Sequence, residues 1–286
     1  MPEKRLLAVF AHPDDETFGL GPTLLHYARQ GVGTYLICAT NGDLGDVPSE
    51  LLRGFASVAD LRLNELACAA EKLGIRRVFT LGYRDSGMMG DPANQHPDSL
   101  WQADQEALAG QIVRIIREVR PQVIVTFDPY GGYGHPDHIA IHRAAVRAFH
   151  EAGEAERYPE QIASGLTPYR PARLYYMLIP RAMIRVAVAL ARLLGRDPRR
   201  MGRNRDLDIQ AILEASLPIH TRLDVRAEYD AALEAYACHA SQQTGGLGLP
   251  LPRIIVRQVL GWQTFHRAWP EVKDGRLVER DLFAGL

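Results

Sequence analysis

Apolar and amphipathic segments alternate along the first half of the chain. Four short runs are apolar enough to be strands covered on both faces, at residues 5–11, 33–40, 76–83 and 122–129. Between them lie three segments with apolar residues at helical spacing, at residues 21–31, 57–75 and 103–120. Gly31, Gly74 and Pro121 are placed to end these helices. The alternation predicts an α/β fold with a doubly wound, mostly parallel sheet.

The second half of the chain is less regular. Residues 172–180 predict a fifth strand, residues 220–226 are a candidate sixth, and residues 227–242 predict a helix before a Gly/Pro loop at 242–252. We expect a single domain over residues 1–286. Its Rossmann-like core covers 1–150 and carries the site, and a smaller irregular C-terminal part, 151–286, completes the cleft.

Composition and charge narrow the class of protein. A net charge of −1 over 286 residues argues against a general nucleic-acid-binding surface. No apolar run approaches the roughly 20 residues of a membrane span, and the first run is too short for a signal-peptide core, so a cytoplasmic protein is expected. Cys38, Cys68 and Cys238 lie far apart in apolar segments without a C-x-x-C spacing. We expect buried free thiols rather than disulfides or a thiolate metal site.

An arginine-rich segment interrupts the second half. Residues 181–205 carry eight arginines around the apolar stretch "IRVAVALARLL". The pattern predicts an amphipathic helix at a subunit interface of a homo-oligomer or over the cleft. Attraction to an anionic membrane surface or to a phosphorylated substrate is the alternative.

Candidate chemistry begins where the first strand ends. The stretch "AHPDDETFG" at residues 11–19 places His12, Asp14 and Asp15 at the carboxyl end of that strand, where open parallel sheets bind ligands. It lacks the G-x-G-x-x-G turn that lets a phosphate approach the backbone, which disfavours a dinucleotide site. An imidazole and a carboxylate in one turn can instead hold a cation such as Zn²⁺, provided that further ligands come from elsewhere.

A second cluster follows the fourth strand. The stretch "DPYGGYGHPDH" at residues 128–138 repeats the His-Pro-Asp theme with His135 and His138. If strands one and four are neighbours, the two loops face each other across the crevice and complete a metal site. His142 is a rival ligand, although its position favours an ordinary histidine on a helix face. Histidine and carboxylate ligands also accept Fe²⁺ or Co²⁺.

Six motifs together resemble one known family. They are "AHPDDE" (11–16), "TNGDLG" (40–45), "RLNEL" (62–66), "GYRDSGM" (82–88), "GGYGHPDH" (131–138) and "HASQ" (239–242). The chain resembles the LmbE-like, or PIG-L, zinc-dependent N-acetylglucosaminyl deacetylases. The wording of the fourth and fifth motifs looks most like the subgroup of the mycothiol and bacillithiol pathways, which acts on glucosaminyl conjugates of low-molecular-weight thiols.

The resemblance implies a role for each matching residue. His12, Asp15 and His138 match the zinc ligands, and Asp14 matches the general base. A second set surrounds the reacting carbonyl: His135 matches the histidine that stabilises the oxyanion, Asp137 its orienting partner, and Tyr133 a tyrosine that polarises the carbonyl. Substrate-binding positions are matched by Arg62, Asp85 and, more loosely, Gln242.

The resemblance implies removal of acetyl from an N-acetylglucosaminyl conjugate, and alternatives stay open at this point. One is an amidase with the same metal centre and a roomier acyl pocket. Another is a non-catalytic, metal-dependent sugar-binding protein, which would need neither Asp14 nor His135. Individual residues also have ordinary explanations: Arg62 could pair with Glu65 on a helix surface, and Asp85 could serve a turn.

Overall fold

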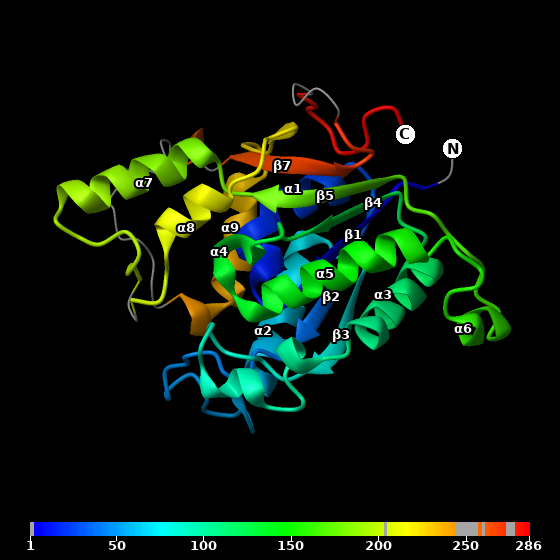
Figure 1. The fold of residues 1–286 in the computed structure, drawn as a ribbon, viewed down its shortest axis with the longest axis horizontal. Helices are drawn as coiled ribbons and strands as arrows, with labels where there is room; N and C mark the ends of the chain where they lie inside the picture. The colour runs from blue at the N-terminus through cyan, green and yellow to red at the C-terminus, as the bar shows by residue number, and fades with distance from the viewer. Residues whose placement is uncertain (1–2, 203–204, 244–256, 259–260, 273–277) are drawn as a thin grey trace.

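The computed structural model describes residues 3–202, 205–243, 257–258, 261–272 and 278–286 (Figure 1). Its centre is a seven-stranded sheet in the order β3-β2-β1-β4-β5-β7-β6. The strands are β1 (Arg5–Phe10), β2 (Gly33–Thr40), β3 (Arg77–Tyr83), β4 (Val123–Thr126), β5 (Arg173–Leu178), β6 (Thr221–Asp224) and β7 (Trp262–Trp269).

The pairing of the strands confirms the predicted doubly wound, mostly parallel sheet. β1 lies between β2 and β4 and runs parallel to both, and β5 continues the parallel part beyond β4. β7 is antiparallel to both of its neighbours, β5 and β6. The sequence analysis missed β7 because "WQTFHRAW" mixes polar and aromatic residues without a clear period of two. Only Thr264 and Phe265 of this strand are buried.

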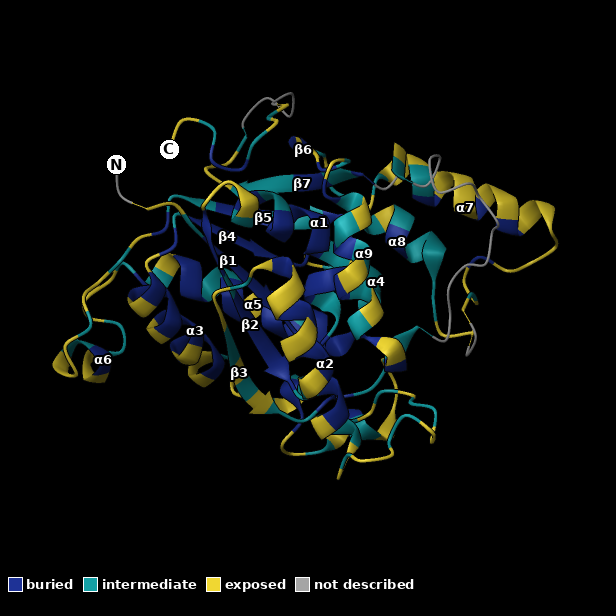
Figure 2. Ribbon diagram, turned by 180° about the vertical axis from the view of Figure 1, so that it is seen from behind, coloured by how far each residue is buried: buried dark blue, intermediate teal, exposed yellow. Residues whose placement is uncertain are grey.

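Helices cover both faces of the sheet. The longer ones are α1 (Asp15–Arg29), α2 (Val58–Leu73), α3 (Gln105–Val119), α5 (Pro136–Glu151), α7 (Arg181–Leu193) and α9 (Tyr229–Cys238). The short ones are α4 (Gly131–Gly134), α6 (Pro159–Ala163), α8 (Ile209–Ala215) and the 3-10 turns Pro92–Gln95, Leu100–Gln102 and Ala240–Gln242. α3 packs beside α5 on one face, whereas α1, α2 and α9 pack together on the other. Burial follows these layers: β1, β2 and β4 at the centre of the sheet are almost wholly buried, whereas the edge strand β3 is partly exposed (Figure 2).

Several helices, such as α2, α3 and α5, begin at a residue whose side chain caps them, whereas α1 does not. α2 begins after Ser57, whose side chain accepts the Asp60 N–H, and ends at Gly74 with φ 70°, as the sequence predicted. α1 begins at Asp15 rather than at residue 21, and Pro22 lies inside it. The glycines and the proline suggested a later start, but burial of this helix against the sheet outweighs its poor helix propensity.

Two of the three cysteines correct the sequence analysis. Cys68 of α2 and Cys238 of α9 form a disulfide, with Cα atoms 5.8 Å apart and 170 residues between them in sequence. Only Cys38 is buried and free, as expected. The prediction was wrong for this pair because packing of α2 against α9 brings the two sulfurs together. The spacing of cysteines in the sequence does not indicate such a tertiary contact.

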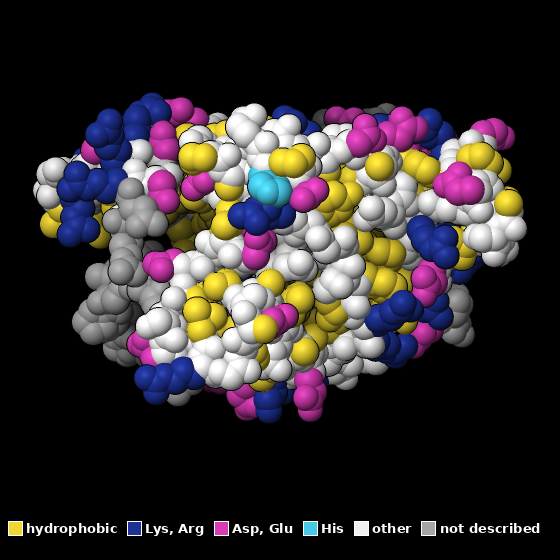
Figure 3. All heavy atoms as spheres, turned by 90° about the horizontal axis from the view of Figure 1, so that it is seen from below, with side chains coloured by type: hydrophobic (Ala, Val, Ile, Leu, Met, Phe, Trp, Pro, Cys, Tyr) yellow, Lys and Arg dark blue, Asp and Glu magenta, His cyan; other side chains and the backbone are white. Residues whose placement is uncertain are grey.

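The arginine-rich segment forms the predicted amphipathic helix, α7. Ile184, Val188 and Ala191 are buried, and α7 packs on α8. Val186 and Leu193 stay 68% and 83% exposed. Lys and Arg side chains gather at the end of the molecule where α7 lies (Figure 3). Among the described residues no helix is both long and apolar enough to span a membrane. Most of the expected loop at 242–252 lies outside the described residues.

Candidate active site

The two His-Pro-Asp motifs meet where the strand order reverses. His12 and Asp15 follow β1, and His135 and His138 follow β4 at the start of α5. Because β1 and β4 are paired neighbours, the two loops lie side by side at the carboxyl edge of the sheet, as predicted.

Three side chains bring ligand atoms to one point. His12 Nδ1 lies 3.1 Å from His138 Nε2 and 3.5 Å from Asp15 Oδ2, and His138 Nε2 lies 3.4 Å from Asp15 Oδ1. Ligand bonds of about 2.0–2.2 Å around tetrahedral zinc place ligand atoms about 3.3–3.6 Å apart. The spacing and the nitrogen and oxygen donors therefore fit a small divalent metal. A ring nitrogen of His135 also lies within 4.8 Å of those of His12 and His138.

Hydrogen bonds behind the cluster fix which ring nitrogen faces it. His12 Nε2 lies 3.1 Å from Asp137 Oδ2, and His138 Nδ1 lies 3.1 Å from the Gly131 carbonyl oxygen. In a neutral ring, each contact favours the proton on the outer nitrogen, so that the inner nitrogen can offer its lone pair to a metal. Phe127 stacks on the His138 ring, with centroids 3.8 Å apart.

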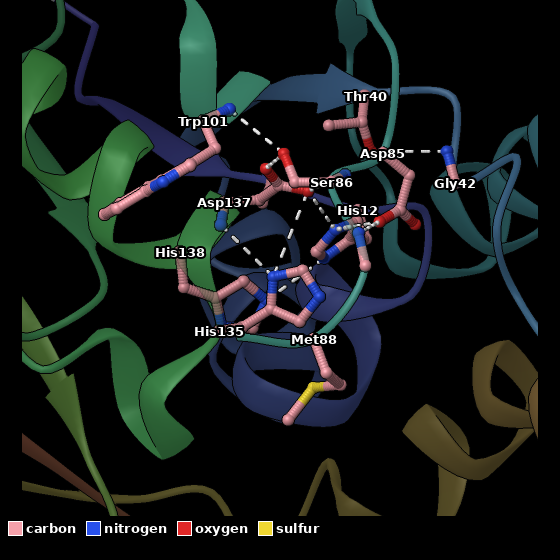
Figure 4. Close-up of polar contacts among 12 residues, drawn as sticks. His12, Thr40, Gly42, Asp85, Ser86, Met88, Trp101, His135, Asp137 and His138 are labelled. Carbon is pink, nitrogen blue, oxygen red and sulfur yellow. Dashed lines mark hydrogen bonds and ion pairs between the residues drawn. The ribbon is translucent and has the colours of Figure 1, made fainter. Parts of the chain in front are cut away.

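Asp137 is held by the loop after β3. Its carboxylate accepts hydrogen bonds from the Ser86 backbone N–H at 2.9 Å and from the Ser86 hydroxyl, and that hydroxyl accepts the Trp101 N–H (Figure 4). The Oδ2 atom of Asp137 lies 3.9 Å from His135 Nδ1. The Asp137 carboxylate thus lies closer to the His12 ring than to His135, for which it was the predicted orienting partner, and the Asp137 backbone N–H donates to His135 Nδ1 at 3.2 Å.

Charges in the cluster act strongly on one another because His12, His138 and Asp137 are buried and the Asp15 side chain is only 11% exposed. Burial disfavours the imidazolium, yet the carboxylates of Asp85, Asp137 and Asp15 hold the pKa of His12 well above its usual value. Burial opposes ionisation of Asp15 as well, but His138 and His12 keep its pKa well below the usual value. Burial lowers the pKa of His135 to about 2, aided by the neighbouring His12 and His138. A cluster that stabilises an anionic Asp15 and a neutral His135 suits a cation.

Asp14 differs from Asp15 in both surroundings and backbone. Burial raises the pKa of Asp14 to about 7, against the lowering effect of Arg62. Its φ of 135° lies in a region that favours glycine, and such strain persists chiefly at functional sites. Asp14 also lines the adjoining cavity. A buried carboxyl group near neutrality that faces a cavity can exchange a proton at physiological pH.

Arg62 anchors this turn and does not lie on a helix surface. It is 3% exposed and donates to Asp14 Oδ2 at 3.1 Å, to the Pro13 carbonyl at 2.7 Å and to the Gly42 carbonyl at 3.0 Å. The expected pair with Glu65 does not form among the described contacts. Glu65 instead accepts the backbone N–H and the hydroxyl of Ser241. These contacts of Arg62 position Asp14.

The other two predicted sugar-binding residues are Asp85, which lies beside His12, and Gln242, which lies near Arg62. Asp85 is buried, accepts the Gly87 N–H at 2.8 Å as a turn residue would, and lies 3.7 Å from His12 Nε2. Gln242 donates to Ser241 at 3.0 Å, and a Cβ on Gly45 would meet both Gln242 and Arg62. Gln242 is therefore near Arg62 but does not line the cavity.

His135 and Tyr133 offer donors at the cluster. His135 Nδ1 accepts the Asp137 backbone N–H at 3.2 Å, which leaves the proton on Nε2. Tyr133 lies on the strained turn α4, lines the cavity and places its ring edge-on to His138 at 4.9 Å. His142 is turned away, with its Nδ1 2.8 Å from the Phe127 carbonyl, as the helix-face interpretation expected.

Sequence reasoning missed a buried pair beside the turn. His239, fully buried, contacts Glu16 Oε1 at 2.8 Å. Glu16 also accepts the Asp14 backbone N–H at 3.0 Å. The "HASQ" and "AHPDDE" motifs contain both residues, but nothing in the sequence indicated that they touch.

A cavity of about 650 Å³ opens from the cluster. Asp14, Asp15, Tyr133 and His138 form one end of it. The rest of its wall comes from α1, α7, α8, α9 and the strands β5 and β7. Residues of β5, α7, α8, α9 and β7, all beyond residue 150, thus line the cavity next to the cluster.

A doubly wound sheet of this kind is the fold of the LmbE-like deacetylases. Accordingly, N,N'-diacetylchitobiose deacetylase from Pyrococcus horikoshii has a similar fold, with a TM-score of 0.63 and 18% identity, over 93% of this chain and 84% of that one. The PIG-L family model, described as GlcNAc-PI de-N-acetylase, matches residues 7–149. The chain belongs to the PIG-L family.

Two relatives span nearly the whole chain. Both are named 1D-myo-inositol 2-acetamido-2-deoxy-alpha-D-glucopyranoside deacetylase. The protein from Acidothermus cellulolyticus is 37% identical over 99% of this chain and 95% of its own length. The protein from Thermobifida fusca is 39% identical over 99% of this chain and 100% of its own length.

Proposed function

We propose that the protein is a metal-dependent N-deacetylase that hydrolyses the acetamide of an N-acetylglucosaminyl conjugate to acetate and a free amino sugar. The observation that carries the proposal is the convergence of His12, Asp15 and His138 beside Asp14, a carboxyl group outside the ligand set with a pKa of about 7. The names of the relatives make a glucosaminyl inositol the first conjugate to test.

His12, Asp15 and His138 would hold the metal, which is Zn²⁺ in our proposal, with Fe²⁺ or Co²⁺ as alternatives. When bound, such a metal polarises the amide carbonyl and lowers the pKa of water. Asp137 and the Gly131 carbonyl keep His12 and His138 in the tautomers that the ligand set requires.

Asp14 moves the proton. Its carboxylate takes one proton from the attacking water and returns it to the nitrogen as the C–N bond breaks, so a pKa near 7 suits both transfers. Arg62 keeps that carboxylate in place through three acceptors on the same turn and on the loop after β2. The neighbouring Asp15 accepts the His12 backbone N–H at 2.7 Å, which holds its carboxylate where it would bind the metal.

His135 and Tyr133 stabilise the tetrahedral oxyanion. A neutral His135 with its proton on Nε2 donates one hydrogen bond, and the Tyr133 hydroxyl donates a second when its ring turns toward the carbonyl. Asp85 and Arg62 lie on the side where the sugar hydroxyls would bind, with Gln242 behind them. A protein that only bound sugar would gain nothing from a strained, buried Asp14.

The test is release of acetate from a glucosaminyl inositol and from N-acetylglucosaminides that differ only in the anomeric substituent. We expect turnover to require added divalent metal after chelation. Absence of acetate release from every member of the panel by metal-loaded protein would contradict the proposal.

A further inference from the structure

The cavity changes character along its length. Its acidic and histidine residues all follow β1 or β4 and lie at the cluster end: Asp14, Asp15, Asp128 and His138. Beyond them the wall is mainly aliphatic and aromatic, with side chains such as Phe18, Met177, Met183, Leu233, Tyr236 and Trp262. A ligand that reaches from the cluster into this cavity therefore passes from a charged centre into an apolar space.

Some of the large apolar side chains in this wall are exposed to solvent. Phe18 is 44% exposed and Ile179 is 50% exposed, although both line the cavity. A Cβ on Gly19 would lie 2.6 Å from Met177 Sδ, so glycine there lets the flexible Met177 side chain lie against α1. Large concave apolar surface on a monomer usually has a ligand.

An acetyl group fills little of this space. About 650 Å³ lies within the 300–1,000 Å³ typical of pockets that enclose a drug-sized ligand. The acetyl group extends beyond the reacting carbonyl by a single methyl carbon. Most of the apolar wall would stay in contact with water while acetamide reacts.

The sheet separates the two sides of the amide. The cluster lies at the β1–β4 boundary, and in the order β3-β2-β1-β4-β5-β7-β6 the cavity strands β5 and β7 lie to one side of it. Asp85 follows β3, which lies on the other side of β1, and Arg62 of α2 contacts Asp14 at the cluster. An amide held at the cluster with its sugar nitrogen toward these polar residues directs its acyl carbon toward β5 and β7.

We propose that this cavity binds the N-acyl chain of the substrate, and that the enzyme hydrolyses glucosaminides whose unbranched acyl chain is longer than acetyl. This inference rests on the proposed function, because the same amide carbonyl and the same proton-transfer groups act. Water adds its oxygen to the acyl carbon, the C–N bond breaks, and Asp14 passes the proton to nitrogen. The products are a short-chain carboxylate and the free amino sugar.

The test is a series of glucosaminides with one fixed aglycone and N-acyl chains from acetyl to octanoyl. Each methylene that becomes fully buried should raise kcat/KM by up to about fourfold. We expect hexanoyl to exceed acetyl by about 10- to 100-fold. Cleavage of the acetyl substrate with no gain on lengthening overturns this inference and leaves the proposed function standing, whereas no cleavage of any member contradicts the proposed function.

A parallel series of N-acetyl alkyl glycosides, whose alkyl chain is attached at the anomeric position, tests whether the cavity binds the aglycone instead. If kcat/KM rises with the length of the glycosidic chain and not with that of the acyl chain, the cavity holds the aglycone, and the inference is wrong. A gain confined to the acyl series supports it.

Substitutions at one helix connect the effect to the cavity. Leu233→Glu puts a carboxylate into the wall and should lower the hexanoyl-to-acetyl ratio at least tenfold, whereas Leu233→Met should keep it. Ala237→Glu, one turn further along α9 and exposed, is the matched control and should leave both activities unchanged. Equal ratios in Leu233→Glu and wild type would refute the assignment of the cavity.

A binding measurement needs neither metal nor turnover. In chelated protein, 1-hexanol and 1-octanol should alter the fluorescence of Trp262, and octanol should bind more tightly by about tenfold or more. Leu233→Glu should weaken both. Affinity that does not depend on chain length would also overturn the inference.

Discussion

Substitution of Asp137 by Asn should weaken metal binding although Asp137 is not in the proposed ligand set. Asp137 is fully buried, and its Oδ2 lies 3.1 Å from His12 Nε2. The His12 proton must sit on Nε2 for Nδ1 to face the metal. In Asp137→Asn an amide NH₂ turned toward the ring would force the opposite tautomer, and an amide oxygen there would lose its charge.

The magnitude follows from that one contact. A hydrogen bond to a charged group contributes about 1.5–3 kcal/mol, which corresponds to roughly 10- to 150-fold in affinity. Loss of a carboxylate behind a metal-binding histidine costs about 10- to 100-fold in general. We therefore expect the Kd for Zn²⁺ to rise by one to two orders of magnitude.

The assay is competition for Zn²⁺ between the protein and a chelator of known affinity. Asp43→Asn is the control, because Asp43 lies in the same region but accepts the Asp85 N–H at 2.9 Å and pairs with Arg84 at 3.4 Å. Near-ultraviolet circular dichroism checks that both variants are folded. Wild-type affinity in Asp137→Asn, or an equal loss in Asp43→Asn, would refute the reasoning.

Three further predictions follow from the same structure. Asp14→Asn should keep bound metal and lose turnover by about 10²–10⁴-fold, whereas Asp15→Asn should lose metal; identical behaviour of the two in metal analysis and acetate release would contradict their separate roles. Arg62→Ala should lower the free energy of unfolding by about 3–5 kcal/mol in urea titrations, because it leaves a buried Asp14 carboxylate without its partner, and an unchanged midpoint would show that the pair carries no such energy. Reduction of the Cys68–Cys238 disulfide should lower the free energy of unfolding by about 2–5 kcal/mol, and reductant should have no such effect on Cys68→Ala.

The parallel half of the fold could be predicted from periodicity. Its strands are continuous apolar runs, and α2 and α3 carry their own caps, as at Ser57 and Gly74. The rest depends on tertiary contacts. α1 contains Gly19, Gly21 and Pro22, and its helical state comes from burial against the sheet. β7 is paired on both sides but half-exposed, so no clean alternation marks it.

The sequence indicated which residues converge at the candidate site, but not which side chains contact one another there. The repeated His-Pro-Asp motif at two strand ends brought together the residues that the structure also brings together. The partners of those residues did not follow from sequence. Arg62 reaches Asp14 rather than Glu65, and the Asp137 carboxylate lies closer to His12 than to His135. Such choices depend on side-chain directions within a few ångströms, which neither spacing nor propensity encodes.

The position of β7 sets the order in which the site is completed during synthesis. The proposed metal ligands all lie within residues 12–138, on loops that need only β1 and β4. β7, which supplies Trp262, Gln263 and Thr264 to the cavity, inserts between β5 and the earlier-made β6. The edge of β5 therefore stays unpaired until residues 262–269 leave the ribosome. A nascent chain can therefore bring its proposed metal ligands together well before the cavity beside them is complete.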